Sequence, residues 1–243
     1  MHARALALTT LIAAAAALGA CSSDNTLGLG VAGSGASGDT VNNAHIRFVN
    51  ATETSLDIAS GGVVGAGGSG IGYGTASTCL SVNPTTPDVS VRLAGTNTVV
   101  PGLATLYQSG VDYTVIAYAG AGGATQFATI TDIFTPVAGQ SGLRVFNAGA
   151  PGTSYDVYVT APGASLDTAT PTFSAVLAGT NSSFINVSTS TAQQVRVTPA
   201  GSTTVLLDVG TVALVVGQSV TMVIAPPLAG TLAPRTFLVA TCG

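Results

Sequence analysis

The sequence predicts an all-β fold built from two tandem antiparallel β-sandwich domains. Three observations support this prediction: short segments alternate apolar and polar residues, glycine and proline turn signals separate them, and the same motifs occur twice in one order. Alternation with period two is typical of half-buried strands, and no long stretch follows the period of a helix. Many short strands with frequent turns favour an Ig-like sandwich, with a small barrel as the alternative.

The first residues resemble a bacterial lipoprotein signal peptide. Arg4 precedes an apolar run over residues 5–18, which has the length of a signal's apolar region and is too short to span a bilayer. The four residues from Leu18 to Cys21 resemble a lipobox, which implies cleavage after residues 1–20 and acyl chains on Cys21. An ordinary cleaved signal followed by a chance cysteine is the alternative.

Residues 21–43 are rich in glycine and serine and have no periodic apolar pattern, which predicts a flexible tether. A flexible chain of about 20 residues has a root-mean-square reach of ~25 Å, enough to hold a domain clear of lipid headgroups. Ser22 and Ser23 follow the cysteine. In the lipoproteins that this chain resembles, aspartate directly after the cysteine favours retention in the inner membrane. We therefore expect a cell-envelope protein anchored in the outer membrane.

The folded part begins near residue 44 and contains an internal repeat. Residues 46–51 read IRFVNA, and residues 143–148 read LRVFNA. Three more motifs return in the same order, pairing 56–58 with 155–157, 91–93 with 195–197, and 113–117 with 221–225. We therefore expect one sandwich over residues 44–138 and a second over residues 139–243, joined by a short connector around residues 136–142.

Alternation within the repeated motifs assigns the core face of each predicted strand. Core positions in two of the strands are Val89, Val91 and Leu93 in the first unit, and Tyr155, Val157 and Val159 in the second. Turn signals such as the Pro-Ala-Gly at residues 199–201 separate the strands.

These motifs resemble the DUF4397 family of uncharacterised bacterial exported domains. The second unit matches best, through residues 143–148, the Tyr-Asp-Val-Tyr-Val of 155–159 and the Val-Arg-Val-Thr-Pro-Ala-Gly of 195–201. Many members carry histidine where Asn50 and Asn147 stand here, so chemistry by such a histidine is not expected. The resemblance implies a β-domain of the cell envelope and brings no catalytic residue.

Composition excludes several classes of function. Charged residues make up only 7% of the chain and the net charge is −4, whereas nucleic-acid binding depends on clustered basic side chains. We therefore expect no nucleic-acid partner. Acidic residues are scattered singly and no Cys/His cluster occurs, so we expect no metal site and no cofactor.

We expect one of the three cysteines to carry lipid and the other two to be available to pair with each other. If Cys21 carries lipid, Cys79 and Cys242 remain in a chain exported to an oxidising compartment, where a disulfide between them is the simplest interpretation. Two separate buried thiols are the alternative, since free cysteine packs as a small hydrophobe.

An arginine and an aspartate recur together in both units. Arg47 with Asp57 and Arg144 with Asp156 occupy the non-core phase of consecutive predicted strands. We predict two structural cross-strand ion pairs, with ligand recognition as the alternative. Four tyrosines would stack on sugars if they were exposed together: Tyr73, Tyr107, Tyr118 and Tyr158.

The sequence favours a non-catalytic envelope lipoprotein, a structural, adhesive or ligand-binding module for an envelope protein or glycan. The alternative is an envelope hydrolase or an enzyme accessory subunit built around His45, the one histidine outside the signal. No Gly-x-Ser-x-Gly elbow supports that alternative, and we assign no catalytic residue.

Replacing Cys21 by alanine removes the predicted lipid attachment site. The variant should lose its acyl chains and leave the membrane fraction, because a lipid on Cys21 is the only expected anchor. Fractionation of cells with detection of the protein tests this, with Ser22→Ala as the matched control. Unchanged membrane association of the Cys21 variant would reject the anchor.

Overall fold

The computed structural model describes residues 42–104, 106–229 and 233–242. The predicted signal peptide, Cys21 and nearly all of the tether lie outside the described residues. All described residues belong to one compact unit. Nowhere in them is there a helix with the length and apolar character needed to cross a bilayer.

The described chain is built from strands and one short 3-10 helix. The first half contains β1 (Ala44–Asn50), β2 (Leu56–Ser60), β3 (Val63–Val64), β4 (Thr75–Val82), β5 (Val89–Leu93), β6 (Asp112–Ala119), η1 (Ala121–Gly123) and β7 (Thr125–Thr131). The second half contains β8 (Gln140–Asn147), β9 (Ser154–Thr160), β10 (Phe173–Leu177), β11 (Ile185–Ser188), β12 (Gln193–Pro199), β13 (Leu207–Val212), β14 (Ser219–Ala225) and β15 (Arg235–Ala240).

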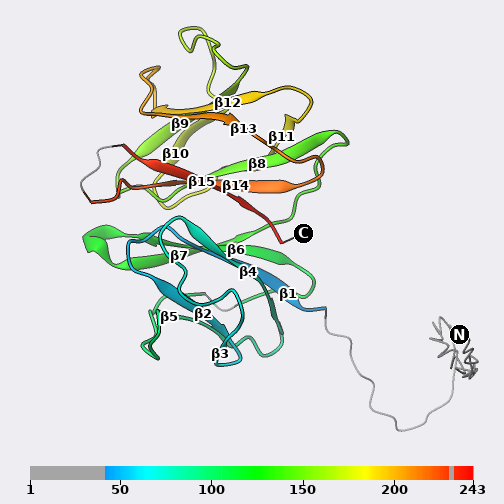
Figure 1. The fold of residues 1–243 in the computed structure, drawn as a ribbon, viewed down its shortest axis with the longest axis vertical. Coiled ribbons are helices and arrows are strands. Elements are labelled where there is room, and N and C mark those ends of the chain that lie inside the picture. The colour runs from blue at the N-terminus through cyan, green and yellow to red at the C-terminus, as the bar shows by residue number, and fades with distance from the viewer. Residues whose placement is uncertain (1–41, 105, 230–232, 243) are drawn as a thin grey trace, which may run out of the picture. The chain divides into compact units, whose positions relative to one another are not determined.

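These strands form four sheets, which make two sandwiches (Figure 1). The first sandwich has an inner sheet β4-β1-β6-β7 and an outer sheet β3-β2-β5. The second has an inner sheet β11-β8-β14-β15 and an outer sheet β10-β9-β12-β13. The all-β sandwich prediction is therefore confirmed.

Each sandwich has its own core, formed by the alternating apolar positions of its two sheets. In the first, Ile46 and Phe48 of β1 meet Ile58 of β2 and Val91 of β5, all fully buried. In the second, Leu143 and Val145 of β8 occupy the corresponding places. Strand alternation therefore sends every second residue of β1 and β8 away from these cores.

The inner sheets differ from the predicted antiparallel pairing, because β1 runs parallel to β6 and β8 runs parallel to β14. Parallel pairs are typical of sheets covered on both faces. That condition holds here: all seven residues of β14 are buried, as are all but the first residue of β8. Their second face is covered by the other sandwich.

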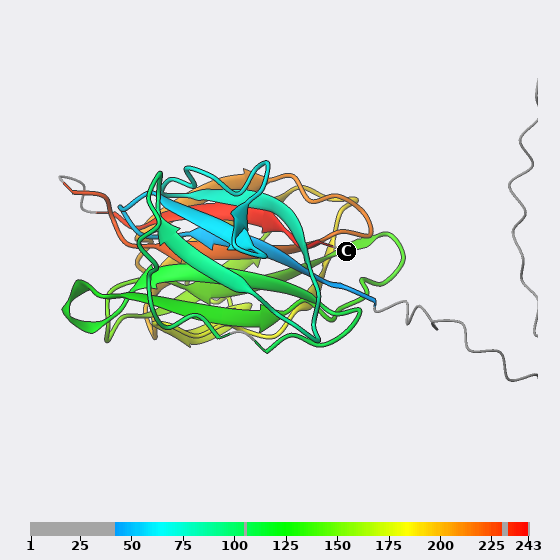
Figure 2. The same cartoon turned by 90° about the horizontal axis from the view of Figure 1, so that it is seen from below.

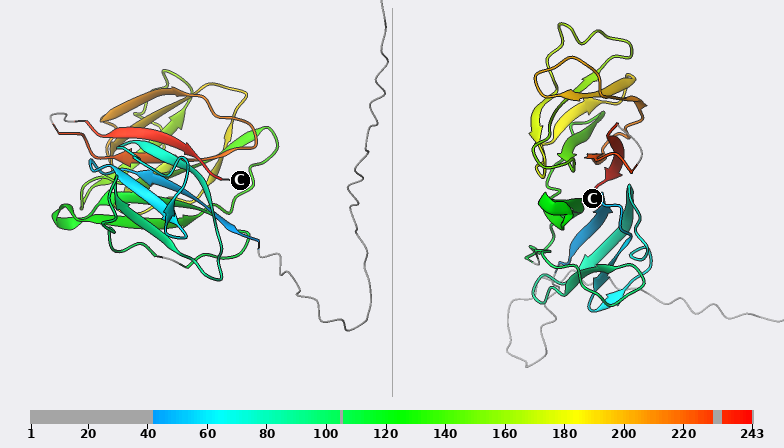
Figure 3. Two further views of the ribbon diagram at one scale, coloured as in Figure 1. Left: turned by 60° about the horizontal axis from the view of Figure 1, so that its bottom comes forward. Right: turned by 90° about the vertical axis from the view of Figure 1, so that its left-hand side faces the viewer.

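We call the surface where the two inner sheets meet the seam. Its apolar cluster consists of Val49, Ala51, Ile116, Ile130, Phe146, Ala148, Val223, Ala225 and Val239. Tyr118 packs edge-on against Phe146, with ring centroids 5.5 Å apart. In the view from below, the strands of the first sandwich lie in front of β14 and β15, and the end-on view separates the two sandwiches (Figures 2 and 3).

The repeat motifs occupy equivalent places in the two sandwiches, with one correction of register. Arg47 lies opposite Thr114 across β1 and β6, and Arg144 lies opposite Thr221 across β8 and β14. Thr114, not Tyr113, is therefore the structural counterpart of Thr221. The sequence motifs aligned β6 with β14 incorrectly by one residue, because both strands contain a run of small and β-branched residues.

Truncation of Phe146 to alanine should destabilise the protein by about 3–5 kcal/mol, since its fully buried ring belongs to the apolar cluster of the seam. Denaturant unfolding of the chain without residues 1–21 measures this. Val216→Ala, at a side chain 58% exposed, is the control and should change stability by less than about 0.5 kcal/mol. Equal effects of the two variants would contradict a packed seam.

Candidate functional site

The structure does not bring the predicted Arg–Asp pairs together. Arg47 lies on β1 of an inner sheet, whereas Asp57 lies on β2 of an outer sheet. Both are on the non-core phase, but of two different sheets, so they point to opposite sides of the sandwich. The same separation holds for Arg144 on β8 and Asp156 on β9. The prediction of cross-strand ion pairs is wrong, because consecutive strands enter different sheets.

Each aspartate instead binds two backbone N–H groups on the outside of its sandwich. Asp57 accepts hydrogen bonds from the backbone N–H groups of Gly70 at 2.6 Å and Gly95 at 2.8 Å. Asp156 accepts them from Ala175 and Gly201, both at 2.7 Å. Gly95 and Gly201 both have positive φ. In both copies, one carboxylate oxygen therefore holds a glycine with positive φ in the turn after the strand that contains the Val-Arg motif, β5 or β12.

Asn50 and Asn147 also have equivalent structural roles, at the ends of β1 and β8. Each is fully buried, and each side-chain oxygen accepts a hydrogen bond from the N–H two residues later. Each amide donates to two backbone carbonyls further along the chain. Asn50 donates to Thr54 and Ile71, and Asn147 donates to Thr153 and to Val176 of β10. These asparagines close the loops that follow the first strand of each unit.

Arg144 crosses the seam and binds the other sandwich. Its Nη2 donates to Asp132, its Nη1 donates to the Thr131 carbonyl at 2.8 Å, and its Nε donates to Thr221 Oγ1 at 2.8 Å. Asp132 also accepts a hydrogen bond from Thr114 Oγ1, at 2.8 Å. This network joins one end of the first sandwich to the middle of the second.

One ring of a stacked aromatic pair covers the Arg144 guanidinium. Phe134 and Phe184 stack with centroids 4.9 Å apart, and the guanidinium carbon lies 4.4 Å from the Phe184 centroid. Phe134 belongs to the connector between β7 and β8, residues 132–139. The connector therefore supplies both the carboxylate that binds Arg144 and the ring that stacks on Phe184, and neither was assigned a role from the sequence.

Burial dominates the electrostatics of this pair, whose side chains are 2% exposed for Arg144 and 0% for Asp132. Burial raises the pKa of the Asp132 carboxyl above its ordinary value, although Arg144 and Thr114 act against the shift. Burial likewise lowers the pKa of the Arg144 guanidinium, against the effect of the Asp132 charge. Loss of hydration is therefore the largest influence on the pKa of both groups, and the attraction between their charges offsets only part of each shift.

A disulfide joins Cys79 of β4 to Cys242, which follows β15, so the simplest interpretation of the two cysteines is confirmed. The bond connects residues 163 positions apart, and its Cα atoms are 5.8 Å apart. In the chain-entropy model a loop of this size stabilises the fold by roughly 5 kcal/mol. Arg47 Nη2 donates to Cys79 Sγ at 3.0 Å.

His45 has one close partner, Asp112, whose Oδ1 lies 2.9 Å from His45 Nδ1. Ser81 lies on the other side of His45 in strand register. The Ser81 hydroxyl accepts a hydrogen bond from Asn43, and the His45 side chain is 49% exposed. A Ser-His-Asp row thus exists across β4, β1 and β6, but its serine and histidine share no hydrogen bond in the described structure, as nucleophile activation would require.

The four tyrosines do not form a common exposed platform for a sugar. Tyr107 and Tyr158 are buried, and burial raises the pKa of Tyr107 to about 12. Tyr73 and Tyr118 pack against the seam. Tyr73 Oη donates to the Pro226 carbonyl at 2.5 Å, so this hydroxyl also joins the two sandwiches.

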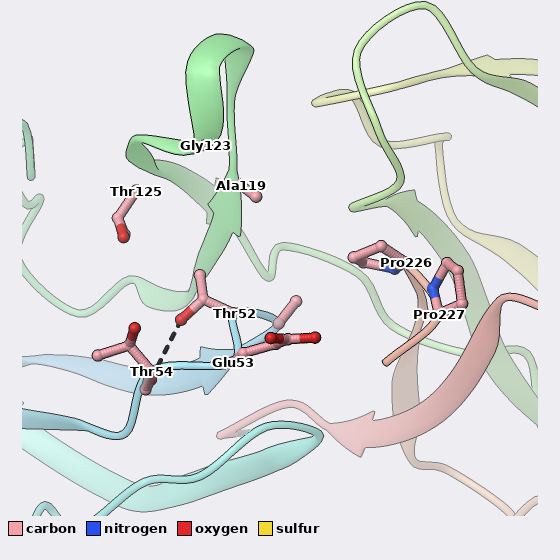
Figure 4. A pocket seen from close by; sticks show the side chains of 9 residues that line it. Thr52, Glu53, Thr54, Ala119, Gly123, Thr125, Pro226 and Pro227 are labelled. Atoms are coloured by element: carbon pink, nitrogen blue, oxygen red, sulfur yellow. Dashed lines mark hydrogen bonds between the residues drawn. The ribbon is translucent and has the colours of Figure 1, made fainter. Parts of the chain in front are cut away.

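A cleft of about 330 Å³ opens at the end of the seam where β1, β6 and β14 terminate. The loop after β1 contributes Thr52, Glu53 and Thr54, and the second sandwich contributes Pro226 and Pro227. Figure 4 shows Glu53 extending from its loop toward the side on which the two prolines lie. Glu53 Oε1 accepts a hydrogen bond from the Ala229 N–H at 3.0 Å. We call this cleft 1.

A second cleft of about 260 Å³, cleft 2, occupies the equivalent position after β8. Residues 149–152 of the β8–β9 loop approach the β6–β7 hairpin of the first sandwich, where Tyr118 and Gln126 line the opening. Each cleft is therefore formed by the loop after the first strand of one sandwich and by the other sandwich. Both depend on the seam for their shape.

The described ranges contain no cluster of three or more histidine, cysteine or acidic side chains that could hold a metal ion. No family model matches the chain, and no curated protein matches it. The available chemistry at the clefts is a carboxylate, hydroxyls, an amide and proline and tyrosine rings, which suits binding.

A double-mutant cycle at Arg144 and Asp132 tests the crossing of the seam. Asp132→Ala should destabilise the protein by about 3–5 kcal/mol, because it leaves a buried cation without its counter-charge. Arg144→Met should also destabilise. The double variant should cost less than the sum of the singles by about 1–3 kcal/mol, measured by denaturant unfolding. Additive effects would show that the two side chains do not interact.

Proposed function

We propose that this protein is a non-catalytic cell-envelope lipoprotein that displays a rigid double sandwich as a binding or adhesive module. Its expected lipid at Cys21 anchors it, its expected tether over residues 21–43 gives it reach, and its seam clefts contact an envelope protein or glycan. The resemblance to the DUF4397 family, which is strongest in the second unit, agrees with an exported β-domain.

The observation that carries this proposal is the shared construction of clefts 1 and 2. Each is lined by both sandwiches, so each needs the two in fixed relative positions. The disulfide, Arg144 and the Tyr73 hydroxyl all bridge the two sandwiches within the seam. Rigid placement of binding loops lowers the entropy lost on association.

The polar groups of the clefts favour recognition over catalysis. Glu53 is the one acidic side chain among the residues that line cleft 1, and residues 149–152 of cleft 2 are Gly, Ala, Pro and Gly. A hydrolytic site of the glycosidase kind needs two carboxylates facing each other across the bond. Hydroxyls, an amide and backbone groups match a hydroxyl-rich glycan or a polypeptide, which offer complementary donors and acceptors.

Capture from the cell envelope tests the proposal. The lipid-free mature chain is immobilised and exposed to solubilised envelope protein and to purified envelope glycan in separate experiments. Thr54→Arg places a long side chain in cleft 1 and should reduce retention of the ligand at least about ten-fold, which is ~1.4 kcal/mol. Thr203→Arg, on the exposed loop between β12 and β13, is the matched control and should bind as the wild type does.

Two outcomes would contradict the proposal in different ways. Retention unaffected by Thr54→Arg would exclude cleft 1 as the contact surface. Retention of no protein and no glycan by the wild-type chain would reject a binding module.

A further inference from the structure

The two equivalent arginines of the seam have different counter-charges. Arg144 contacts the Asp132 carboxylate, which follows β7 by one residue. In the described chain Arg47 has no carboxylate partner; it donates to Cys79 Sγ, and its Nε is buried without a hydrogen-bond partner. The Arg47 guanidinium therefore lacks a carboxylate equivalent to the one that Arg144 contacts.

The repeat explains why the anion is missing. The N–H of Asp132 donates to the Asp112 carbonyl, and the N–H of Thr241 donates in the same way to the Ser219 carbonyl. Thr241 therefore stands in the second sandwich where Asp132 stands in the first. The next residue is Cys242, which forms the disulfide. Disulfide sulfur thus lies beside Arg47, where a carboxylate equivalent to that of Asp132 would make the two arginine sites alike.

This arrangement distinguishes the two sulfur atoms of the bond. In thiol–disulfide exchange, the sulfur whose negative charge is better stabilised leaves faster. The Arg47 guanidinium lies against Cys79 Sγ at hydrogen-bond distance, so it would stabilise a thiolate there. Cys242 has no such cation in the contacts of the described residues. Both cysteines are partly exposed, so the contact with Arg47 is what distinguishes the two sulfur atoms. An incoming thiolate should therefore attack Cys242.

We propose that Cys79–Cys242 is a directional exchange site for an envelope dithiol. A thiolate of the dithiol forms a bond to Cys242 Sγ, the disulfide breaks, and its electron pair remains on Cys79 as a thiolate beside Arg47. The second thiol of the dithiol then attacks the mixed disulfide and releases Cys242. The dithiol is oxidised to its disulfide, the protein gains two electrons, and the two thiol protons pass to Cys242 and to solvent.

Reduction would release the segment after β15 without unfolding the second sandwich. β15 pairs with β14 over six residue pairs, from Val220 with Ala240 to Ala225 with Arg235. The bond lies beyond these pairs, at the end of the seam opposite clefts 1 and 2. Exchange there would remove the covalent tie between the sandwiches while Arg144 still crosses the seam.

Mapping of mixed disulfides tests the direction of attack. The oxidised, lipid-free mature chain is exposed to excess glutathione, quenched with acid at early times, and digested for mass spectrometry. We expect the glutathione adduct on Cys242 to exceed that on Cys79 at least about ten-fold, because an opposite charge favours the ionised leaving group. Equal adducts, or a preference for Cys79, would overturn the proposal.

Variants test whether the charge of Arg47, rather than easier access to Cys242, causes the preference for attack at Cys242. Arg47→Met should reduce the preference toward equality and slow reduction about 3–10-fold. Arg47→Gln, which keeps a donor without the charge, should behave in the same way and serves if the methionine variant fails to fold. Arg92→Met, which removes a guanidinium bound to the Gly62 carbonyl, is the control and should retain the preference. A preference that survives both Arg47 variants would refute the role of the charge.

Discussion

The structure depends on the coverage of each inner sheet on both faces. β1, β6, β8 and β14 have apolar residues toward their own core and a second apolar set toward the seam. Exposing that second face would leave a contiguous apolar surface in water, which monomeric proteins rarely tolerate. The two sandwiches therefore pack as one body through the same face, as the subunits of a symmetric dimer do.

Much of the fold follows from local sequence. Alternation correctly placed Val89 and Val91 in the core but also placed Leu93 there, which is 38% exposed at the end of β5, and the repeat identified equivalent strands. The seam was not predicted, because alternation divides a strand into two faces without saying what covers the second one. The apolar run of residues 222–225 in β14 was a usable signal, since continuous apolar residues indicate a strand covered on both sides. Arg47 and Asp57 were paired wrongly for the same reason: phase along a strand does not identify its sheet.

The duplicated sequence produces equivalent frameworks with different chemistry. Asn50 and Asn147 close the same loop, and Asp57 and Asp156 hold the same turn. The two arginines, in contrast, meet a carboxylate in one copy and a disulfide in the other. Asp132 after β7 supplies the carboxylate in one copy, whereas Cys79 of β4 and Cys242 after β15 supply the disulfide in the other. The clefts diverge likewise. The loop after β1 lines cleft 1 with threonine and glutamate side chains, whereas the loop after β8 lines cleft 2 with glycine and proline.

Hydrogen exchange across a denaturant series tests most directly whether the seam makes one body of two sandwiches. Amides of the outer pairs β2–β5 and β9–β12 report on the two sandwiches separately, because neither pair belongs to the seam. In the oxidised, lipid-free mature chain, both pairs should become exchangeable at the same denaturant concentration and with the same free energy of opening. Opening of one pair at a clearly lower denaturant concentration than the other would contradict this account.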